Sequence, residues 1–498
     1  MRSYPKYTFP LILFLLAIVL MWQNASVPGF FQDGYLYSAF AKNAVQSGHW
    51  LVPHLSSATY SEFYQHTPFI FILQGLFFKF FGASYFVARI FVGVFFLILL
   101  FVQYKFLKRE EGEWTAFLNG LLLILLPPLM KKLRFPNMDI PLMLSVYLSL
   151  TCYYLLLIKN KKKYWLGTGF FFGTSLLIKG PIGLFIPTII FIHLLVTKKL
   201  VLLKDSTPWL TLAFGFAMFS IWPLSLHLAG KFYIFEHYLQ STFIHTAYDG
   251  RDAGNYSVIT YVFFLFKSSP LWALLFFYSF KNFKINFKNN YFSLSLIASM
   301  TFLVLFSLMK FKYSHYLIPF YPFYVFVGVY SIKDKLKPWQ DKITTGTLLL
   351  TILLTSYFAI KPMSKITRDP EIFEMLLAAK QLKSFPTAVG NVNAIYPFFA
   401  LANLLAFEKS AAVYNVPVDV FNAQVENKSL TGMFKLDEPN NVDDKVWGFF
   451  VNKETYLEVI KNNPKVAEKF LILSYHSSKN MYFIIDRTLA NSDLIINF

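Results

Sequence analysis

The chain has 498 residues, of which 56% are hydrophobic and 20% aromatic, and its formal net charge is +19. This apolar content is too high for an ordinary soluble protein or for a disordered chain. The charge gives no reason to expect a nucleic-acid partner, because most of the lysines lie in short connections between apolar runs, where anionic lipid headgroups would meet them. Cys152 is the only cysteine, so neither a disulfide nor a cysteine metal cluster is expected.

About eleven apolar stretches between residues 9 and 361 are long enough, or nearly long enough, to cross a bilayer, which takes about 20 residues. The first stretch, residues 9–22, follows two basic residues as the core of a signal peptide would. The regular alternation of the connections downstream favours an uncleaved first span instead. The sequence therefore predicts an α-helical, multi-pass membrane protein.

The connections alternate between a lysine-rich set and a lysine-poor set. Cytoplasmic loops of membrane proteins are enriched in Lys and Arg, so the lysine-rich set is predicted to be cytoplasmic, together with the N-terminus. The lysine-rich connections lie at residues 2–6, 105–109, 159–163, 198–204, 281–288 and 333–342. The other connections and everything after residue 361 then face the outside, because the number of predicted spans is odd.

The first outer connection, residues 26–83, is long enough to hold structure of its own. Residues 35–47 show a helical pattern that ends at Gly48, and Gly commonly terminates helices. A second helical pattern covers residues 68–81, where large apolar side chains recur at helical spacing. This pattern predicts a helix that lies in the membrane interface, and the two helices together form a lid-like platform.

The tail has a different composition from the rest of the chain. Charged and amide residues become frequent, and the apolar runs shrink to strand length. We therefore divide the chain into a transmembrane domain, residues 1–362, and a small α/β domain outside the membrane, residues 363–498. The tail pattern predicts helices at residues 371–384 and 453–463 and strands at residues 445–451, 470–475 and 481–485.

Two aspartates lie at the predicted outer boundary, where ionisable groups are costly and mark candidate sites. Asp33 opens the first loop helix, and Asp139 opens a later span. A carboxylate in a partly desolvated outer cavity can accept a proton from a hydroxyl or hold a divalent metal ion. The alternative for both residues is helix capping, and the two roles can coexist.

Several basic residues in the outer connections break the charge rule. Such an exception suits a bound anion, and Arg grips a phosphate through two parallel hydrogen bonds. For Lys179 the alternative is an ordinary helix C-terminus, with Gly180 as its cap and Pro181 opening the next helix. The residues that could neutralise a phosphate or diphosphate are Lys131, Lys132, Arg134, Lys179, Lys310 and Lys312.

Other polar residues of the outer connections are weaker candidates. No histidine, including His66, has the spacing of a zinc site. Solvated loop charges are the simpler explanation for the polar residues, but some of them could line a groove for an acceptor. The acceptor-groove candidates are Tyr37, Glu62, His237 and Arg251.

An ordered set of residues resembles a known family. The run at residues 33–53 looks like the first-loop signature of bacterial glycosyltransferases related to dolichyl-phosphate-mannose protein mannosyltransferases and to the lipid A aminoarabinose transferase. The signature residues in this run are Asp33, Tyr37, Ala41, Ser47, Gly48, Trp50 and Pro53. Further matches in the same order are Pro68, Gln74, Phe80, Phe81, Gly82, Arg134, Asp139, Lys179, Gly180, Pro181, Pro270, Trp272, Lys312, Tyr316, Pro319 and Pro322.

The resemblance implies the multi-span C-type glycosyltransferase fold and a bacterial inner-membrane location. It implies a transferase that moves a sugar from a polyprenyl phosphate carrier to lipid A, another envelope glycan or a protein on the outer side. By carry-over, Asp33 would be the acidic residue at the reaction centre, Asp139 the second carboxylate, and Lys179 and Lys312 ligands of the carrier phosphate. A divalent metal ion held by Asp33 and Asp139 is the only cofactor considered.

The chain departs from the family pattern in the first loop. Gly34 stands where the family often has Glu, His66 aligns with a phosphate-binding lysine, and Thr67 replaces the first loop proline. These departures keep open a family member that has lost catalysis and serves as a binding subunit. A transporter or flippase of a polyprenyl-linked glycan is the other alternative, but transporters usually carry internal repeats and charged helices at the midplane, and neither is found.

Overall fold

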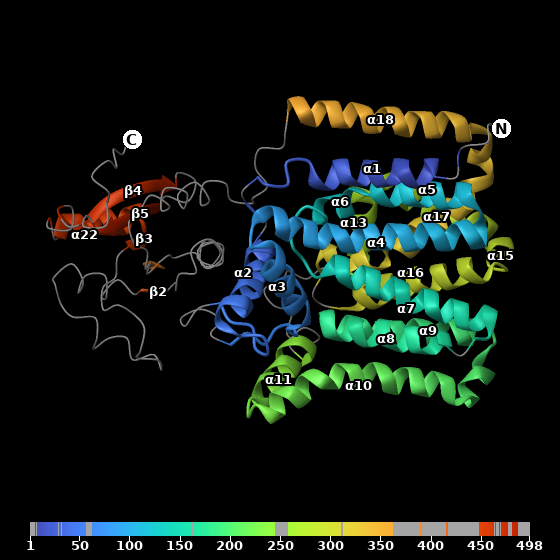
Figure 1. Ribbon diagram of the computed structural model, residues 1–498, viewed down its shortest axis with the longest axis horizontal. Helices are drawn as coiled ribbons and strands as arrows, with labels where there is room; N and C mark the ends of the chain where they lie inside the picture. The colour runs from blue at the N-terminus through green and yellow to red at the C-terminus, as the bar shows by residue number, and fades with distance from the viewer. Residues whose placement is uncertain are drawn as a thin grey trace. The chain divides into compact units, whose positions relative to one another are not determined.

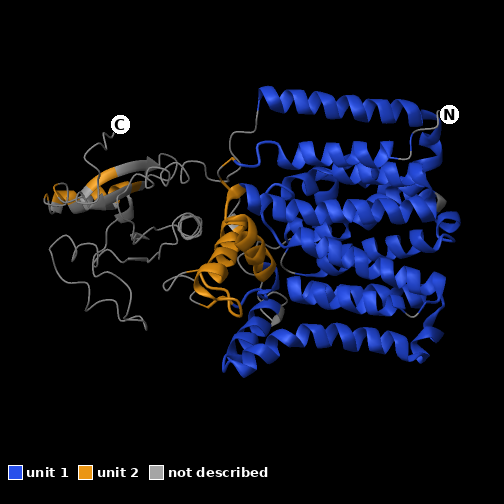
Figure 2. Cartoon of the chain, viewed as in Figure 1, with its two compact units in different colours: residues 1–26, 64–70, 86–364 blue, residues 27–63, 71–85, 365–498 orange. Residues whose placement is uncertain are grey.

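The computed structural model of the chain is mostly helical. It describes residues 5, 7–27, 29–30, 32–55, 62–161, 163–244, 257–309, 312–361, 389–390, 415–416, 448–462, 464, 468, 470–476 and 481–486. Contacts divide the chain into two compact units (Figure 2). Unit 1 contains residues 1–26, 64–70 and 86–364, and unit 2 contains residues 27–63, 71–85 and 365–498.

The first half of the helical part contains nine α-helices and one 3-10 turn in the described residues. In chain order these are α1 (Thr8–Trp22), α2 (Gln32–Ser47), α3 (Phe69–Phe81), α4 (Tyr85–Glu111), α5 (Glu113–Ile124), α6 (Pro127–Lys132), α7 (Asp139–Lys159), α8 (Lys163–Lys179), η1 (Gly180–Leu184) and α9 (Phe185–Val196).

The second half continues in the same style, with short 3-10 or π turns between helices. Its elements are η2 (Leu200–Lys204), α10 (Ser206–Leu228), α11 (Phe232–Leu239), η3 (Gln240–Ile244), α13 (Thr260–Ser268), α14 (Pro270–Tyr278), η4 (Ser279–Asn282), α15 (Phe283–Asn286), α16 (Asn290–Leu308), η5 (Ser314–Phe320), α17 (Tyr321–Leu336), η6 (Lys337–Trp339) and α18 (Gln340–Ile360).

The long helices of unit 1 lie lengthwise beside one another (Figure 1). Helix α7 packs against α8, α8 against α10, and α17 against α5, α14 and α16. Their facing sides carry the buried apolar core, whereas many large apolar side chains remain exposed on the outer sides. Because such a surface is unfavourable in water and favourable in hydrocarbon, this unit is a multi-pass membrane structure.

Judged by length and composition, the described residues contain fewer membrane-spanning stretches than the eleven predicted. Six stretches of the described chain are long and apolar enough to cross a membrane, and the pair α13 and α14, bent by 117°, would make a seventh. Two of the six stretches, Lys163–Val196 and Ser314–Ile360, each contain two helices joined by 3-10 turns. Helices α1 and α5 are apolar but have only 15 and 12 residues. The multi-pass character is confirmed, and the count of eleven is not.

Glycines bring α8 and α10 unusually close together. A Cβ atom on Gly169 would lie 2.8 Å from the carbonyl oxygen of Thr211, and one on Gly173 would lie 2.8 Å from that of Gly215. Small residues allow such backbone approach in membrane helix pairs, where packing rather than the hydrophobic effect drives association. The α8–α10 contact therefore depends on these glycines.

The two loop helices of unit 2 agree with the sequence prediction. Helix α2 ends before Gly48, whose φ of +73° suits a glycine terminator, and α3 covers the predicted range to within a residue. The two helices meet at Gly75, where a Cβ atom would lie 2.9 Å from the carbonyl oxygen of Ala41. Phe40 packs against Phe71 at 5.2 Å between ring centroids.

The described part of the tail, also in unit 2, contains a three-stranded antiparallel sheet. Strands β3 (Gly448–Asn452), β4 (Phe470–His476) and β5 (Met481–Asp486) pair in the order β3-β5-β4, and α22 (Lys453–Asn462) follows β3. A separate two-residue pair joins β1 (Val389–Gly390) to β2 (Asn415–Val416). Three strands and one helix thus lie where the alternation pattern predicted them. The predicted boundary at 362/363, the helix at 371–384, Lys310 and Arg251 lie outside the described residues.

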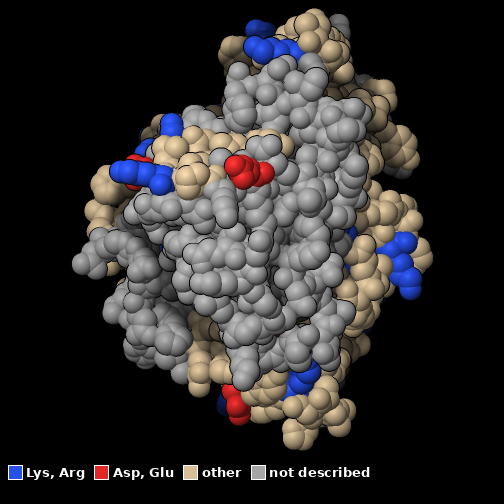
Figure 3. Space-filling view, turned by 90° about the vertical axis from the view of Figure 1, so that its left-hand side faces the viewer, with Lys and Arg blue, Asp and Glu red and all other residues tan. Residues whose placement is uncertain are grey.

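Figure 3 shows one face of the protein, on which the described Lys, Arg, Asp and Glu side chains form small separate groups.

Candidate functional site

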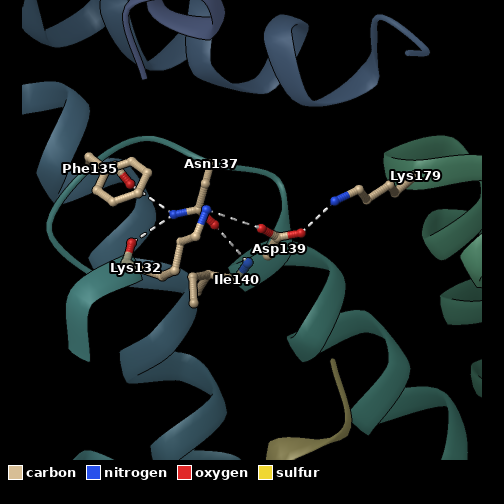
Figure 4. A network of polar contacts seen from close by, with 6 residues as sticks. All are labelled: Lys132, Phe135, Asn137, Asp139, Ile140 and Lys179. Atoms are coloured by element: carbon tan, nitrogen blue, oxygen red, sulfur yellow. Dashed lines mark hydrogen bonds and ion pairs between the residues drawn. The ribbon is translucent and has the colours of Figure 1, made fainter. Parts of the chain in front are cut away.

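The site centres on Asp139, the first residue of α7, which is only 4% exposed. The loop before it is closed by the amide of Asn137 (Figure 4). Its Nδ2 donates to the carbonyl oxygens of Lys132 at 2.7 Å and Phe135 at 2.8 Å, and its Oδ1 accepts from the Ile140 backbone N–H at 3.1 Å. Asn137 therefore does the capping that the sequence assigned to Asp139, and the Asp139 carboxylate is left to other partners.

Two lysines from different elements converge on this carboxylate (Figure 4). The Nζ atom of Lys179, at the end of α8, lies 2.6 Å from Oδ1 of Asp139. The Nζ atom of Lys132, at the end of α6, lies 3.9 Å from Oδ2. Both lysine side chains are largely buried, at 14% and 15% exposure. One carboxylate thus faces two ammonium groups in a place with little water.

Residues of η5 complete the cluster. His315 interacts electrostatically with Asp139, Lys179, Lys132 and His66. The neighbouring Tyr316 presents its ring to Lys179, with Nζ 5.4 Å from the ring centroid. His315 was not among the predicted site residues, although it follows closely after Lys312, one of the basic residues that break the charge rule of the outer connections. The pattern of charges in the outer connections was the signal that could have found it.

Two lysines and two histidines surround the Asp139 carboxylate. Such a set of hydrogen-bond donors in a poorly hydrated site suits a bound anion, because charge-assisted hydrogen bonds are strongest where water is excluded.

Arg134 does not join the cluster. It is buried, and its guanidinium donates to the carbonyl oxygen of Gln23 at 3.0 Å and to that of Leu20 at 3.4 Å. Burial lowers the pKa of Arg134 to about 10, which leaves it charged at physiological pH. The buried Arg89 of α4 donates to the Arg134 carbonyl at 3.1 Å and to that of Ala25 at 2.6 Å. Arg134 therefore ties down the end of α1, where a cation is favourable, and its role as a phosphate ligand stays a prediction.

The remaining predicted cations differ in their surroundings. Lys131 is exposed at the end of α6. Lys312 donates to the carbonyl oxygen of Met309, and partial burial lowers its pKa. The predicted phosphate ligands that the structure gathers on the Asp139 carboxylate are Lys132 and Lys179, and His66 interacts with His315.

The remaining site candidates belong to two different units of the chain. In unit 2, Asp33 lies in the first turn of α2, which begins one residue earlier, and not at a cap before the helix. Tyr37 is half-buried, with its ring 5.4 Å from that of Phe71. Glu62 is also half-buried. In unit 1, His237 is exposed and lies 5.3 Å from Tyr64 between ring centroids.

A divalent metal ion does not fit the surroundings of Asp139. Both oxygens of this carboxylate face lysine ammonium groups, which would repel a cation. No group of three or more His, Cys, Asp or Glu side chains among the described residues could hold a metal ion. A metal site that includes Asp33 stays a prediction.

The fold and the site together define a class of protein, a multi-pass membrane protein with a buried carboxylate between two lysines. Residues 65–222 match the family profile described as dolichyl-phosphate-mannose-protein mannosyltransferase. The matched stretch is less than half of the chain, and it contains Asp139, Lys132 and Lys179. A sequence search among curated proteins gives no significant match.

Two solved proteins share the fold over nearly the whole chain. ArnT from Cupriavidus metallidurans bound to undecaprenyl phosphate matches with a TM-score of 0.69 and 14% identity, covering 98% of each chain. The Archaeoglobus fulgidus oligosaccharyltransferase in its apo form matches with a TM-score of 0.55 and 12% identity, covering 98% of this chain and 76% of its own. The resemblance and the fold predicted from the sequence are thereby confirmed.

Proposed function

We propose that the protein is a membrane glycosyltransferase that moves a sugar from a polyprenyl-phosphate donor to an acceptor on the outer side of a bacterial inner membrane. The acceptor is lipid A, another envelope glycan or a protein. One observation carries the proposal: a buried carboxylate shared by two lysines, in the fold of an enzyme solved with undecaprenyl phosphate.

The chemistry of transfer fits the charges of the cluster. When the acceptor hydroxyl attacks the sugar, the bond between the sugar and the donor phosphate breaks, and the phosphate leaves with its lipid chain carrying the negative charge. Cations placed where this charge develops stabilise the transition state. Lys132, whose Nζ lies 3.9 Å from Oδ2 of Asp139, is the residue we assign to the leaving phosphate, with His66 and Lys312 as further candidates.

The acceptor hydroxyl must lose its proton during the attack. A positioned carboxylate can take it, and such general-base catalysis contributes about 10²- to 10⁴-fold to a rate. We assign this role to Asp33 by the family resemblance. Asp139, whose oxygens face two lysines, is assigned to orienting those lysines. The orientation follows from the charge of the loops, which puts the tail on the outer side.

Mass spectrometry of lipid A and envelope glycans tests the proposal. A deletion strain is complemented with the wild-type gene, with Asp33→Asn, with Asp139→Asn, or with Thr168→Val as a matched control in a buried position of α8. We expect a sugar-sized mass with wild type and Thr168→Val, and none with either aspartate variant at equal protein level.

Other outcomes would redirect the proposal. If the wild-type gene restores no sugar-sized mass in any fraction, the protein is no transferase, and the binding-subunit or flippase alternatives take its place. If Asp33→Asn lowers the protein level but leaves the activity per molecule unchanged, Asp33 stabilises α2 and takes no proton.

A further inference from the structure

In the turn that carries Lys179, the sequence leaves one backbone carbonyl without its usual helical hydrogen-bond donor. In an α-helix the carbonyl of Leu177 would accept from the N–H four residues later, but that residue is Pro181, which has none. Gly180 breaks the helix with a φ of +40°, and η1 begins there. Since a buried carbonyl without a donor is costly, another group must supply the hydrogen bond.

Thr67 supplies this bond from a distant part of the sequence. Its hydroxyl donates to the carbonyl oxygen of Leu177, and the side chain is only 1% exposed. The segment around Thr67 is itself held, because the hydroxyl of Thr242 donates to the carbonyl oxygen of Gln65 at 3.2 Å. A proline at position 67, as in the family pattern, would have no hydroxyl to donate.

Tyr238 holds the other side of the same turn. A Cβ atom added to Gly180 would lie 1.8 Å from the Tyr238 hydroxyl oxygen, so position 180 has no room for a side chain. The ring of Tyr238 is fully buried, with Trp222 of α10 edge-on at 5.1 Å and Phe235 stacked at 6.0 Å between centroids. These rings keep the tyrosine from moving away.

We propose that Thr67 and Tyr238 form a two-sided clamp on the turn at residues 177–181, and that this clamp positions Nζ of Lys179 on Asp139. A lysine side chain is a flexible stem, so its ammonium group stays in one place only if its backbone is held. Both residues are positioning residues, since neither contacts the carboxylate in the structure. The clamp rests on the proposed function for its role in catalysis, but the placement of Lys179 can be measured without it.

Chemical modification of Lys179 tests the placement. The full-length protein in detergent is treated with an amine-acylating ester, and modification of Lys179 over time is followed by mass spectrometry of its peptide. An ion-paired, buried ammonium group reacts slowly. We expect faster modification in Thr67→Val, which loses only the hydroxyl, and in Gly180→Ala, which collides with Tyr238. Thr67→Ser, which keeps the hydroxyl, and Thr168→Val, a buried threonine of α8 away from the turn, should react as wild type does.

Kinetics with a polyprenyl-phosphate sugar test the consequence for catalysis. A displacement of about 1 Å in a catalytic group can cost about 100-fold in rate. We therefore expect Thr67→Val to lower kcat by about 10- to 100-fold with little change in the donor KM, and Thr67→Ser to restore it.

The two measurements separate the possible failures. If Lys179 reacts at the wild-type rate in both Thr67→Val and Gly180→Ala, the clamp does not exist, whatever the activity. If both variants expose Lys179 but kcat is unchanged, the clamp is structural and the positioning role is wrong. If the wild type transfers no sugar, the proposed function fails, and the modification rates still decide the placement of Lys179.

Discussion

Unit 1 contains two buried lysine–carboxylate pairs that are nearly identical as ion pairs. Lys179 and Asp139 lie 2.6 Å apart, and Lys333 and Glu111 lie 2.9 Å apart. The carboxylate side chains are both 5% exposed, and the lysine side chains are 14% and 17% exposed. The first pair joins the consecutive helices α7 and α8, and the second joins α4 and α17, which are distant in sequence. Burial and distance alone therefore do not distinguish a site from a structural contact.

The partners around the two pairs differ. Glu111 also accepts from Nδ2 of Asn289 at 2.7 Å, and the same asparagine caps α16 through its Oδ1. The Lys333 carbonyl accepts from Nε1 of Trp114 at 3.2 Å. Each group has a neutral or opposite partner, and the contacts join α4, α16 and α17. Around Asp139 the additional groups are a second lysine and His315, which join α6, α7, α8 and η5.

This difference indicates what marks a candidate site in a membrane protein. A buried ion pair whose remaining partners are neutral is complete, and it adds specificity to helix packing. A buried carboxylate that two lysines approach can also hold those lysines in place for an anionic ligand. The comparison predicts that substitutions at Asp139 affect activity, whereas those at Glu111 affect stability.

The largest expected effect is that of Asp139→Asn on transfer. Two buried lysines lose their shared counter-charge and move apart, so we expect the rate per molecule to fall by about 1000-fold. The measurement is transfer of labelled sugar by purified protein in nanodiscs. Activity within threefold of wild type would show that the cluster is a structural contact like that of Glu111.

Glu111→Gln should have the opposite profile. Removing one charge of a buried pair leaves Lys333 without a counter-ion, which costs about 3 kcal/mol of stability. We expect a lower thermal unfolding midpoint in detergent, with the rate of the folded protein unchanged. A loss of transfer without loss of stability would contradict the division between the two clusters.

Asn137→Ala tests the loop that shapes the cluster. It removes three hydrogen bonds that fix Lys132 and the start of α7, and a bond of this kind contributes about 1 kcal/mol. We expect a moderate loss of stability and a roughly tenfold loss of rate, since a misplaced group lowers catalysis. Thermal unfolding and transfer assays on the same preparation measure both, and an unchanged rate would refute the shaping role.

Lys132→Gln should have the smallest effect of the four. Its contact with Asp139 is the longer one, at 3.9 Å, so removing its charge costs the carboxylate little. If Lys132 binds the leaving phosphate, we expect the donor KM to rise about fivefold, equivalent to about 1 kcal/mol. An unchanged donor KM at low ionic strength would remove Lys132 from the phosphate site.

The sequence predicted the members of the Asp139 cluster better than their roles. Apolar runs locate helix ends, and polar residues at ends on one side of the membrane can meet, which is how Lys132, Asp139 and Lys179 were found together. The contacts of Arg134 with the end of α1 were not foreseen, because charge is visible in a sequence and the carbonyls that accept its hydrogen bonds are not. The sequence showed Thr67 only as a departure from the family pattern, because the Leu177 carbonyl that accepts its hydrogen bond lies 110 residues away.

The close contact between α8 and α10 at their glycines joins a helix with a largely exposed apolar surface to the helix that carries Lys179. Only 22% of the apolar part of α10 is buried in the protein, which leaves most of this helix available to lipid tails. Helix α11 packs on α10 and carries Tyr238 to the turn of Lys179. If the proposed clamp holds Lys179, a change in bilayer thickness that tilts α10 shifts the tyrosine as well, and we expect the turnover rate to depend on the lipid composition of the membrane.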